Sequence, residues 1–352
     1  MQRTTISIAL LLTLSLACSL GGLSAAPTLP PTTPSSQGEA SPPPSQAGAG
    51  GESERRCGDN VCDGPENPQN CPQDCVESTL PAELPAPGKQ TVSEHWVTNP
   101  TTGARLYVLV TSPEAETQIL YPALVIVPGG IGYASNSSQS DNLSELLAAE
   151  GIVAVEFDPD GRGQSEGVED YNGCAQQDGL AAVIEFTAAL PQVDPARVGV
   201  ASFSYGITMA SGALARHPDL PVLFLMDWEG PADRFDTTVG CSENVRIDFA
   251  PCDDLEFWRE REALKFIPDV QVPYQRLQSE KDHVQPDVDH AIAMINAAVQ
   301  GDSPWVRLND LSPNQTYDLD NPPPMITEND TRSLEQLTLQ YAQEMFRLHS
   351  TP

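Results

Sequence analysis

Ser204 has the surroundings of a chemically active serine. It follows a run of small and β-branched residues, 198–202, and precedes a stretch of helical spacing that opens with Gly206. A serine at such a strand-to-helix turn can expose its hydroxyl group, but a hydroxyl is a poor nucleophile until a base accepts its proton. Near pH 7 the usual acceptor is a neutral imidazole. The sequence must therefore also supply a histidine.

A glycine-rich loop after the apolar run 123–127 is the second chemically suggestive feature. A backbone without side chains can point an N–H group at an oxygen on which negative charge develops. The N–H of Gly130 or Ile131, together with that of Tyr205, is the expected pair of donors to such an oxyanion. The alternative is a tight turn that uses glycine for its positive φ and takes no part in chemistry.

Short β-branched runs alternate with helical stretches from about residue 90 onward. This alternation predicts βαβ units and a largely parallel sheet in one α/β domain over residues 90–350. The expected strands are 106–111, 123–127, 153–157, 198–202, 222–226, 274–277 and 305–308. The expected helices are 142–150, 175–189, 205–216, 287–299 and 332–348.

The segment 198–206 resembles the G-x-S-x-G nucleophile elbow of the α/β-hydrolase fold family, in which the serine occupies a strained turn. Ser202 replaces the first glycine of the motif, and Gly206 retains the second. The loop after 123–127 resembles the oxyanion loop of the family, with Pro128 where a histidine is usual. The resemblance thus assigns Ser204 the role of nucleophile.

The segment 157–165 resembles the D-x-R-G-x-G-x-S turn that follows the fourth strand in this family. Asp160 stands where the arginine is usual, and Arg162 is the candidate to pin the turn instead. Taken together, the motifs place residues 90–350 nearest the dienelactone-hydrolase-like and prolyl-oligopeptidase-like branches. The resemblance implies a mostly parallel sheet of about eight strands flanked by helices.

The triad of this family follows the order serine, carboxylate, histidine. The run 273–278 leads into a loop that contains Asp282, which is the expected acid. The histidine is the difficulty, because the segment 308–317 after the last expected strand contains none. The base must therefore come from elsewhere in the chain, or the catalytic site has been lost.

The five histidines of the chain are His95, His217, His283, His290 and His349. His283 is the expected base because it lies in the acid loop, and His290, which begins the next helix, is the alternative. Asp227 or Glu229, at the end of the strand around 222–226, is the alternative acid. The other three histidines are expected at structural or surface positions.

The segment 228–268 is longer than a simple crossover and contains two cysteines and several aromatic residues. The resemblance implies a lid that shapes the substrate pocket, and the alternative is a wide loop that packs on the sheet. A disulfide between Cys241 and Cys252 would close this segment. Pairing of either cysteine with Cys174 is the alternative, and it would leave an odd thiol.

The charge of the chain limits its partners. The sequence has 49 acidic and 18 basic residues, which gives a formal net charge of −31. Such a charge repels the phosphates of nucleic acids. We therefore expect no nucleic acid partner, and a small-molecule or peptide substrate instead.

The N-terminal segment is typical of an exported protein. Residues 1–17 combine a basic residue with a short apolar run, which indicates a signal peptide. The run ends at Cys18, in a context that resembles a bacterial lipobox, so Cys18 is the expected site of lipidation and of membrane anchoring. Cleavage near residues 24–26, which would give a soluble secreted protein, is the alternative. Residues 18–54 are rich in Pro, Ser and Gly and are expected to form a disordered tether.

A cysteine-rich stretch covers residues 55–77 and is followed by a Pro-rich linker, 78–89. Its cysteines are expected to form disulfides in an oxidising compartment, with the pairing open: Cys57, Cys62, Cys71 and Cys75. Its oxygen-bearing side chains are candidate calcium ligands: Asp59, Asp63, Glu66, Asn70 and Asp74. The alternative is a disulfide-stapled spacer in which Asp and Asn form turns.

Two functions are compatible with this sequence. The first is a secreted or lipid-anchored serine hydrolase that cleaves an ester or amide bond through Ser204 and needs no cofactor for catalysis. The second is a non-catalytic binding protein that keeps the α/β-hydrolase fold after losing the triad histidine. The position of an imidazole relative to the Ser204 hydroxyl distinguishes them.

Overall fold

The computed structural model describes residues 90–114, 119–134, 142–237, 241, 250–285 and 287–350. The expected signal peptide, Cys18, the tether, the cysteine-rich stretch and the Pro-rich linker all lie outside these residues. Within the described part of the chain, no helix combines the length and the apolar character needed to cross a membrane.

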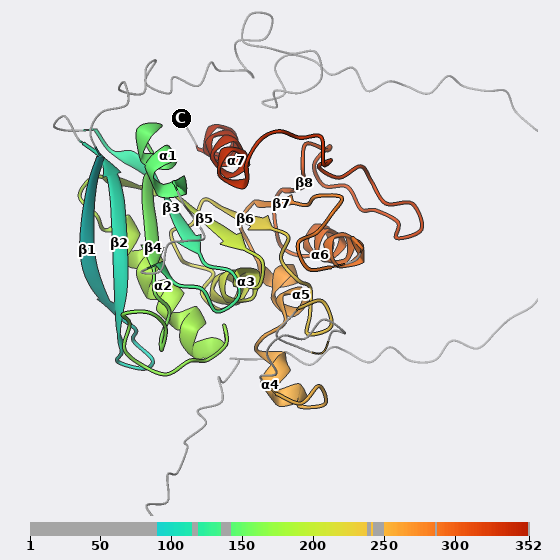
Figure 1. Ribbon diagram of the computed structural model, residues 1–352, viewed down its shortest axis with the longest axis horizontal. Helices are drawn as coiled ribbons and strands as arrows, with labels where there is room; N and C mark the ends of the chain where they lie inside the picture. The colour runs from blue at the N-terminus through green and yellow to red at the C-terminus, as the bar shows by residue number, and fades with distance from the viewer. Residues whose placement is uncertain are drawn as a thin grey trace, which may run out of the picture. The chain divides into compact units, whose positions relative to one another are not determined.

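An eight-stranded sheet forms the centre of the domain, with the strands in the order β1-β2-β4-β3-β5-β6-β7-β8 (Figure 1). The first two strands pair antiparallel, and β2 pairs antiparallel with β4, whereas all later neighbours are parallel. The strands are β1 (Gln90–Thr98), β2 (Arg105–Pro113), β3 (Tyr121–Val127), β4 (Val153–Phe157), β5 (Val193–Phe203), β6 (Phe224–Trp228), β7 (Tyr274–Leu277) and β8 (Val306–Leu308). The expected fold class is confirmed.

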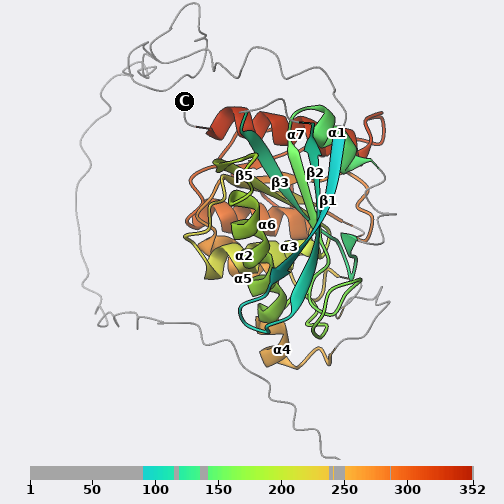
Figure 2. The same ribbon diagram turned by 90° about the vertical axis from the view of Figure 1, so that its left-hand side faces the viewer.

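Helices cover both faces of the sheet (Figure 2). One face is covered by α1 and α7, and the other by α2, α3, α5 and α6. The helices are α1 (Leu143–Ala149), α2 (Cys174–Ala188), α3 (Gly206–Arg216), α4 (Leu255–Arg259), α5 (Ala263–Phe266), α6 (Asp289–Gln300) and α7 (Leu334–His349), and η2 (Ile267–Asp269) is a 3₁₀ turn.

Burial on two faces explains why the central strands are apolar at successive positions. Every residue of β3 is buried, so this strand does not alternate between apolar and polar residues. Its side chains divide between two apolar clusters, one on each face of the sheet. Full burial of each large aliphatic or aromatic side chain contributes about 1.5–3 kcal/mol, which makes these two clusters the main source of stability.

The parallel strands all end at the same edge of the sheet, and this arrangement assembles the site. Four loops meet there because β3, β5, β6 and β7 are neighbours in the sheet. The glycine-rich loop follows β3, Ser204 follows β5, Glu229 follows β6 and His283 lies in the loop after β7. Ligands of open α/β sheets bind at this edge.

Candidate active site

Ser204 occupies a strained turn between β5 and α3. Its φ is +50°, a value that is uncommon for a residue with a side chain, and its N–H donates to the carbonyl of Trp228 at 2.8 Å. A non-glycine residue in this region costs on the order of 1–3 kcal/mol, which the surrounding structure must offset. The turn directs the serine out of the sheet toward the neighbouring loops, as the elbow motif implied.

The small residues around Ser204 are required because the backbones are close together. A Cβ atom at Gly206 would lie 2.6 Å from the carbonyl oxygen of Pro128, and one at Gly129 would lie 2.8 Å from that of Phe203. Ser202, where the motif has glycine, is buried and its hydroxyl donates to the carbonyl of Met226 at 3.2 Å. Its polar group therefore has a partner, which explains how serine is accommodated at this position.

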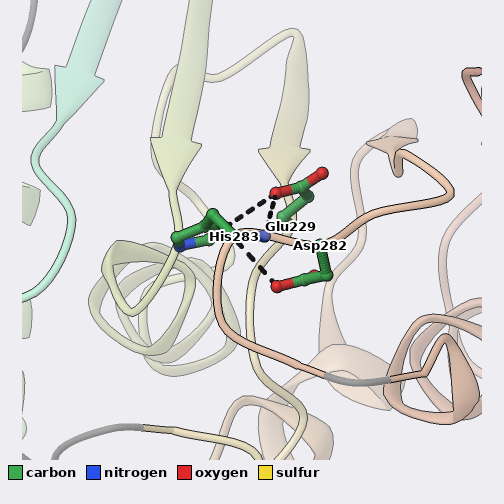
Figure 3. Close-up of side chains that lie close together, drawn as sticks. All are labelled: Glu229, Asp282 and His283. Carbon is green, nitrogen blue, oxygen red and sulfur yellow. Dashed lines mark hydrogen bonds and ion pairs between the residues drawn. The ribbon is translucent and has the colours of Figure 1, made fainter. Parts of the chain in front are cut away.

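An imidazole faces the Ser204 hydroxyl. Nε2 of His283 lies 2.9 Å from Oγ of Ser204, and Nδ1 of the same ring lies 2.7 Å from Oε2 of Glu229. Figure 3 shows His283 between the carboxylates of Glu229 and Asp282. The structure thus brings together the expected nucleophile and the expected base in hydrogen-bonding geometry, although they are far apart in sequence.

Glu229 is held firmly in place at the end of β6. It has a φ of +47°, and its side chain is almost completely buried. One carboxylate oxygen accepts from the N–H and the hydroxyl of Ser279, and the other accepts from the N–H of His283 at 3.2 Å as well as from its ring. A buried carboxylate with this many donors has a fixed position and therefore fixes the ring that it contacts.

Asp282, the expected acid, does not take the position that orients the ring. Its Oδ1 lies 3.5 Å from Nδ1 of His283, farther than the 2.7 Å contact of Glu229. Instead, Oδ1 accepts from two backbone N–H groups of its own loop, Val284 at 2.7 Å and Gln285 at 2.9 Å. The alternative acid, Glu229, is therefore the one in hydrogen-bond contact with the imidazole, because the loop turns the Asp282 carboxylate back on itself.

Asp227 and His290, the remaining alternatives, have other partners. Asp227 is completely buried and forms an ion pair with Arg276 at 2.5 Å, and it accepts from the hydroxyl of Tyr274 at 2.7 Å. Burial raises the pKa of the Asp227 carboxyl, and the charge of Arg276 opposes this rise. His290 is also buried, and its Nε2 lies 3.2 Å from Asp282. Neither residue is placed to act on the Ser204 hydroxyl.

The expected oxyanion donors surround a pocket that opens on Ser204. Gly130 and Tyr205 line this pocket, whereas Ile131 is not among the lining residues. Gly130 has a φ of +56°, and its carbonyl accepts from Arg162 at 3.4 Å. Arg162, which was expected to pin the turn 157–165, thus also contacts this loop, and it is held by Glu169 at 2.7 Å and Asn172 at 2.8 Å.

The position after β8, where the family carries its histidine, is used differently here. Asn309 has a φ of +49°, and its side chain forms two hydrogen bonds with the backbone of Gln278, at 2.9 and 3.0 Å. This side chain therefore connects Gln278, the residue after β7, to the end of β8. The loop after β7, which begins at this point, carries His283 in place of a histidine after β8.

The segment between β6 and β7 contributes to the pocket. Pro231, Asp236 and Thr237 from this segment line it together with Ser204. The expected disulfide joins Cys241 to Cys252, with a Cα–Cα distance of 5.6 Å. This pairing rules out the alternative in which either cysteine bonds to Cys174, which is itself disulfide-bonded.

Glu229, Asp282 and His283 are also a group of described residues that could hold a metal ion. Candidate ligand atoms of Glu229, Asp282 and His283 lie within 4.8 Å of one another. However, both ring nitrogens of His283 already have partners, Glu229 on one side and Ser204 on the other. The arrangement is suited to proton transfer from a serine.

One family model matches part of the chain. A model of the X-Pro dipeptidyl-peptidase (S15) family matches residues 102–238, which is less than half of the chain but includes β2 to β6 and Ser204. No protein of curated function matches the sequence.

Three solved structures illustrate the structural relatives. Puromycin hydrolase has a TM-score of 0.55 and 16% identity, with coverage of 76% of this chain and 40% of that one. Dipeptidyl peptidase 4 of Porphyromonas gingivalis has a TM-score of 0.53 and 18% identity, with coverage of 73% and 35%. Est1E of Butyrivibrio proteoclasticus, solved with ferulic acid bound, has a TM-score of 0.52 and 16% identity, with coverage of 72% and 98%.

The chain spans less than half of the length of the first two relatives and nearly all of Est1E. Structural similarity at such low identity shows the fold alone, and the family match supports a hydrolase. The chain therefore has the α/β-hydrolase fold, with a serine, an imidazole and a carboxylate gathered at the edge of the sheet where the loops after β3, β5, β6 and β7 meet.

Proposed function

We propose that the protein is a serine hydrolase in which Ser204 is the nucleophile, His283 the general base and Glu229 the acid that orients the base. The observation that carries this proposal is the continuous contact from Glu229 through His283 to the Ser204 hydroxyl, at 2.7 and 2.9 Å. Such a chain of contacts converts a weakly nucleophilic hydroxyl into one that attacks a carbonyl carbon.

The reaction follows from the positions of these groups. Nε2 of His283 accepts the proton of Ser204 as Oγ bonds to the carbonyl carbon, and Glu229 stabilises the positive charge that the ring acquires. Backbone N–H groups at Tyr205 and in the loop of Gly130 face the oxygen of the tetrahedral intermediate. The ring returns the proton to the departing alcohol or amine. Water, deprotonated by the same ring, then attacks the acyl carbon, and the ring returns this proton to Oγ of Ser204 as the bond to the acyl group breaks.

The pocket favours substrates without negative charge near the scissile bond. Among the described residues that line it, Glu229, Asp236 and Asp282 carry carboxylates and none is lysine or arginine. Asp236 lies farther along the segment that begins with Glu229, and burial raises the pKa of its carboxyl. A neutral or cationic ester, or the amide bond of a peptide, fits this lining better than an anionic acyl group.

The main observation behind a non-catalytic function was the absence of a histidine after β8. His283 supplies an imidazole from the neighbouring loop, so that observation no longer favours a lost active site. The family match and the relatives, which are peptidases and hydrolases by name, also support turnover.

We further propose that the protein works outside the cytoplasm, anchored through a lipid on Cys18. The Cys241–Cys252 disulfide supports export, because disulfides persist mainly in oxidising compartments. The apolar N-terminal run that ends at Cys18 supports the anchor.

A fluorophosphonate probe tests the nucleophile and the base. We expect the wild type to be labelled covalently, Ser204→Ala to show no labelling, and His283→Ala to react at least about a hundredfold more slowly because the hydroxyl keeps its proton. His217→Ala is the matched control, since this exposed histidine pairs with Asp178 away from the pocket. Failure of the well-folded wild type to react would remove the proposed activity.

Substitution of Glu229 by glutamine tests the acid. The amide preserves size but cannot hold the positive ring, so turnover of an activated ester should fall by on the order of 10²–10⁴-fold with little change in KM. Glu166→Gln, at an exposed ion pair with Arg105, should leave turnover unchanged. Wild-type turnover in Glu229→Gln would show that this carboxylate does not orient the base.

Removal of the charge of Asp236 tests whether the pocket disfavours anionic substrates. The turnover ratio of an anionic succinate monoester to a neutral acetate ester should rise about tenfold in Asp236→Asn, because one repulsive charge is lost. Asp219→Asn, at an exposed site outside the pocket, serves as the control. An unchanged ratio would mean that Asp236 does not face the substrate.

Fractionation of bacterial cells tests the anchor. The wild type should sediment with membranes and incorporate labelled fatty acid, whereas Cys18→Ser should do neither. A soluble, unlabelled wild-type protein would instead indicate cleavage downstream of Cys18.

A further inference from the structure

A second carboxylate–imidazole pair lies next to the proposed triad and is not used by it. The side chains of Asp282 and His290 are each only 1% exposed, and Oδ2 of Asp282 lies 3.2 Å from Nε2 of His290. His290 belongs to the first turn of α6, whereas Asp282 belongs to the loop after β7. The pair therefore connects the loop of His283 to a helix packed against the sheet.

Asp282 organises the backbone of that loop. Its Oδ1 accepts from the N–H groups of Val284 and Gln285, at 2.7 and 2.9 Å, which closes a tight turn around His283. Its Oδ2 accepts from the side chain of Gln278, at the end of β7, at 2.9 Å. Burial alone would raise the pKa of the Asp282 carboxyl, but these bonds and His290 outweigh burial and hold the pKa well below its usual range.

His290 is the contact that fixes this turn from outside the loop and β7. Its Nε2 lies 3.2 Å from Oδ2 of Asp282, which is an ion-pair distance, although neither ring nitrogen meets hydrogen-bond geometry with a partner among the described residues. The pair is therefore a close polar contact between a buried ring and a buried carboxylate.

The position of the base makes such a contact necessary. His283 lies on a loop and its side chain is 44% exposed, so packing alone does not fix its ring. Glu229 contacts the ring and the N–H of His283, whereas the turn that follows His283 is held by Asp282. A displacement of about 1 Å in a reacting group can cost on the order of a hundredfold in rate.

We propose that Asp282 and His290 are a positioning pair, which fixes the loop after β7 so that Nε2 of His283 stays within reach of the Ser204 hydroxyl. The inference rests on the proposed serine hydrolase function. It assigns Asp282 a role different from that of Glu229: Asp282 holds the turn that follows the base, and Glu229 contacts the base itself.

Two substitutions of His290 distinguish its polar contact with Asp282 from its contribution to packing. His290→Phe fills the space without a donor, and His290→Gln keeps an N–H near the position of Nε2. We expect His290→Phe to lower kcat on an activated ester by about 10–100-fold, with KM within about twofold of the wild type. We expect His290→Gln to recover kcat to within about threefold of the wild type. His217→Phe is the matched control, because it removes a second His–Asp contact of this chain, 2.8 Å from Asp178.

Hydrogen exchange at the amides of Val284 and Gln285 reports on the loop independently of activity. Both should exchange at least about tenfold faster in His290→Phe than in the wild type and His217→Phe, because the acceptor that protects them is released. If His290→Phe does not fold, Asp282→Asn gives the same two readings, since it keeps the shape and removes the charged acceptor.

The outcomes separate this inference from the proposed function. A wild type that does not react with fluorophosphonate removes the hydrolase, while amide exchange still decides whether the pair holds the loop. A reactive wild type whose His290→Phe variant retains kcat, or retains slow exchange at Val284 and Gln285, overturns the positioning role and leaves the triad intact.

Discussion

The contact between Nδ1 of His283 and Glu229 is the interaction on which the candidate site depends. A carboxylate at 2.7 Å fixes the hydrogen of the ring on Nδ1, so Nε2, 2.9 Å from Ser204, carries the lone pair that a base requires. Without this contact the ring could rotate or adopt the other tautomer. The strained turn at Ser204 would then expose a hydroxyl that has no proton acceptor.

The register of two parallel strands makes this contact possible. Trp228 pairs with Leu277, the last residues of β6 and β7, and the N–H of Glu229 donates to the carbonyl of Leu277 at 3.0 Å. Glu229 therefore emerges beside the start of the loop that carries His283. A base from the loop after β7 reaches the same serine that a base after β8 would reach, because both loops leave the sheet at the same edge. The two hydrogen bonds between the Asn309 side chain and the backbone of Gln278 connect the loop after β8 to the loop after β7.

The strands of the core and the nucleophile were predictable from sequence because their signals are local. Buried parallel strands are continuous apolar runs, and the strand-turn-helix pattern around Ser204 needs small residues at fixed positions. β1 was not predicted, because it lies at the edge of the sheet and most of its residues are exposed. The choice of Glu229 over Asp282 depends on strand register and on a turn that directs one carboxylate inward. Its place in the loop after β7 favoured Asp282, whereas Glu229 makes the closer contact with the imidazole.

A buried polar layer behind the triad explains why Asp227 is unavailable as an acid. Arg276 contacts Asp227, the carbonyl of Gly230 at 2.9 Å and the side chain of Gln278 at 2.8 Å, so it holds the backbone on both sides of Glu229. Gln278 in turn donates to Asp282. A buried ion pair is weak evidence for stability, since desolvation offsets much of its attraction. Here the ion pair fixes positions: the fully buried guanidinium of Arg276 connects the end of β6 to the end of β7. The proposed triad takes its carboxylate from the residue after β6 and its imidazole from the loop after β7.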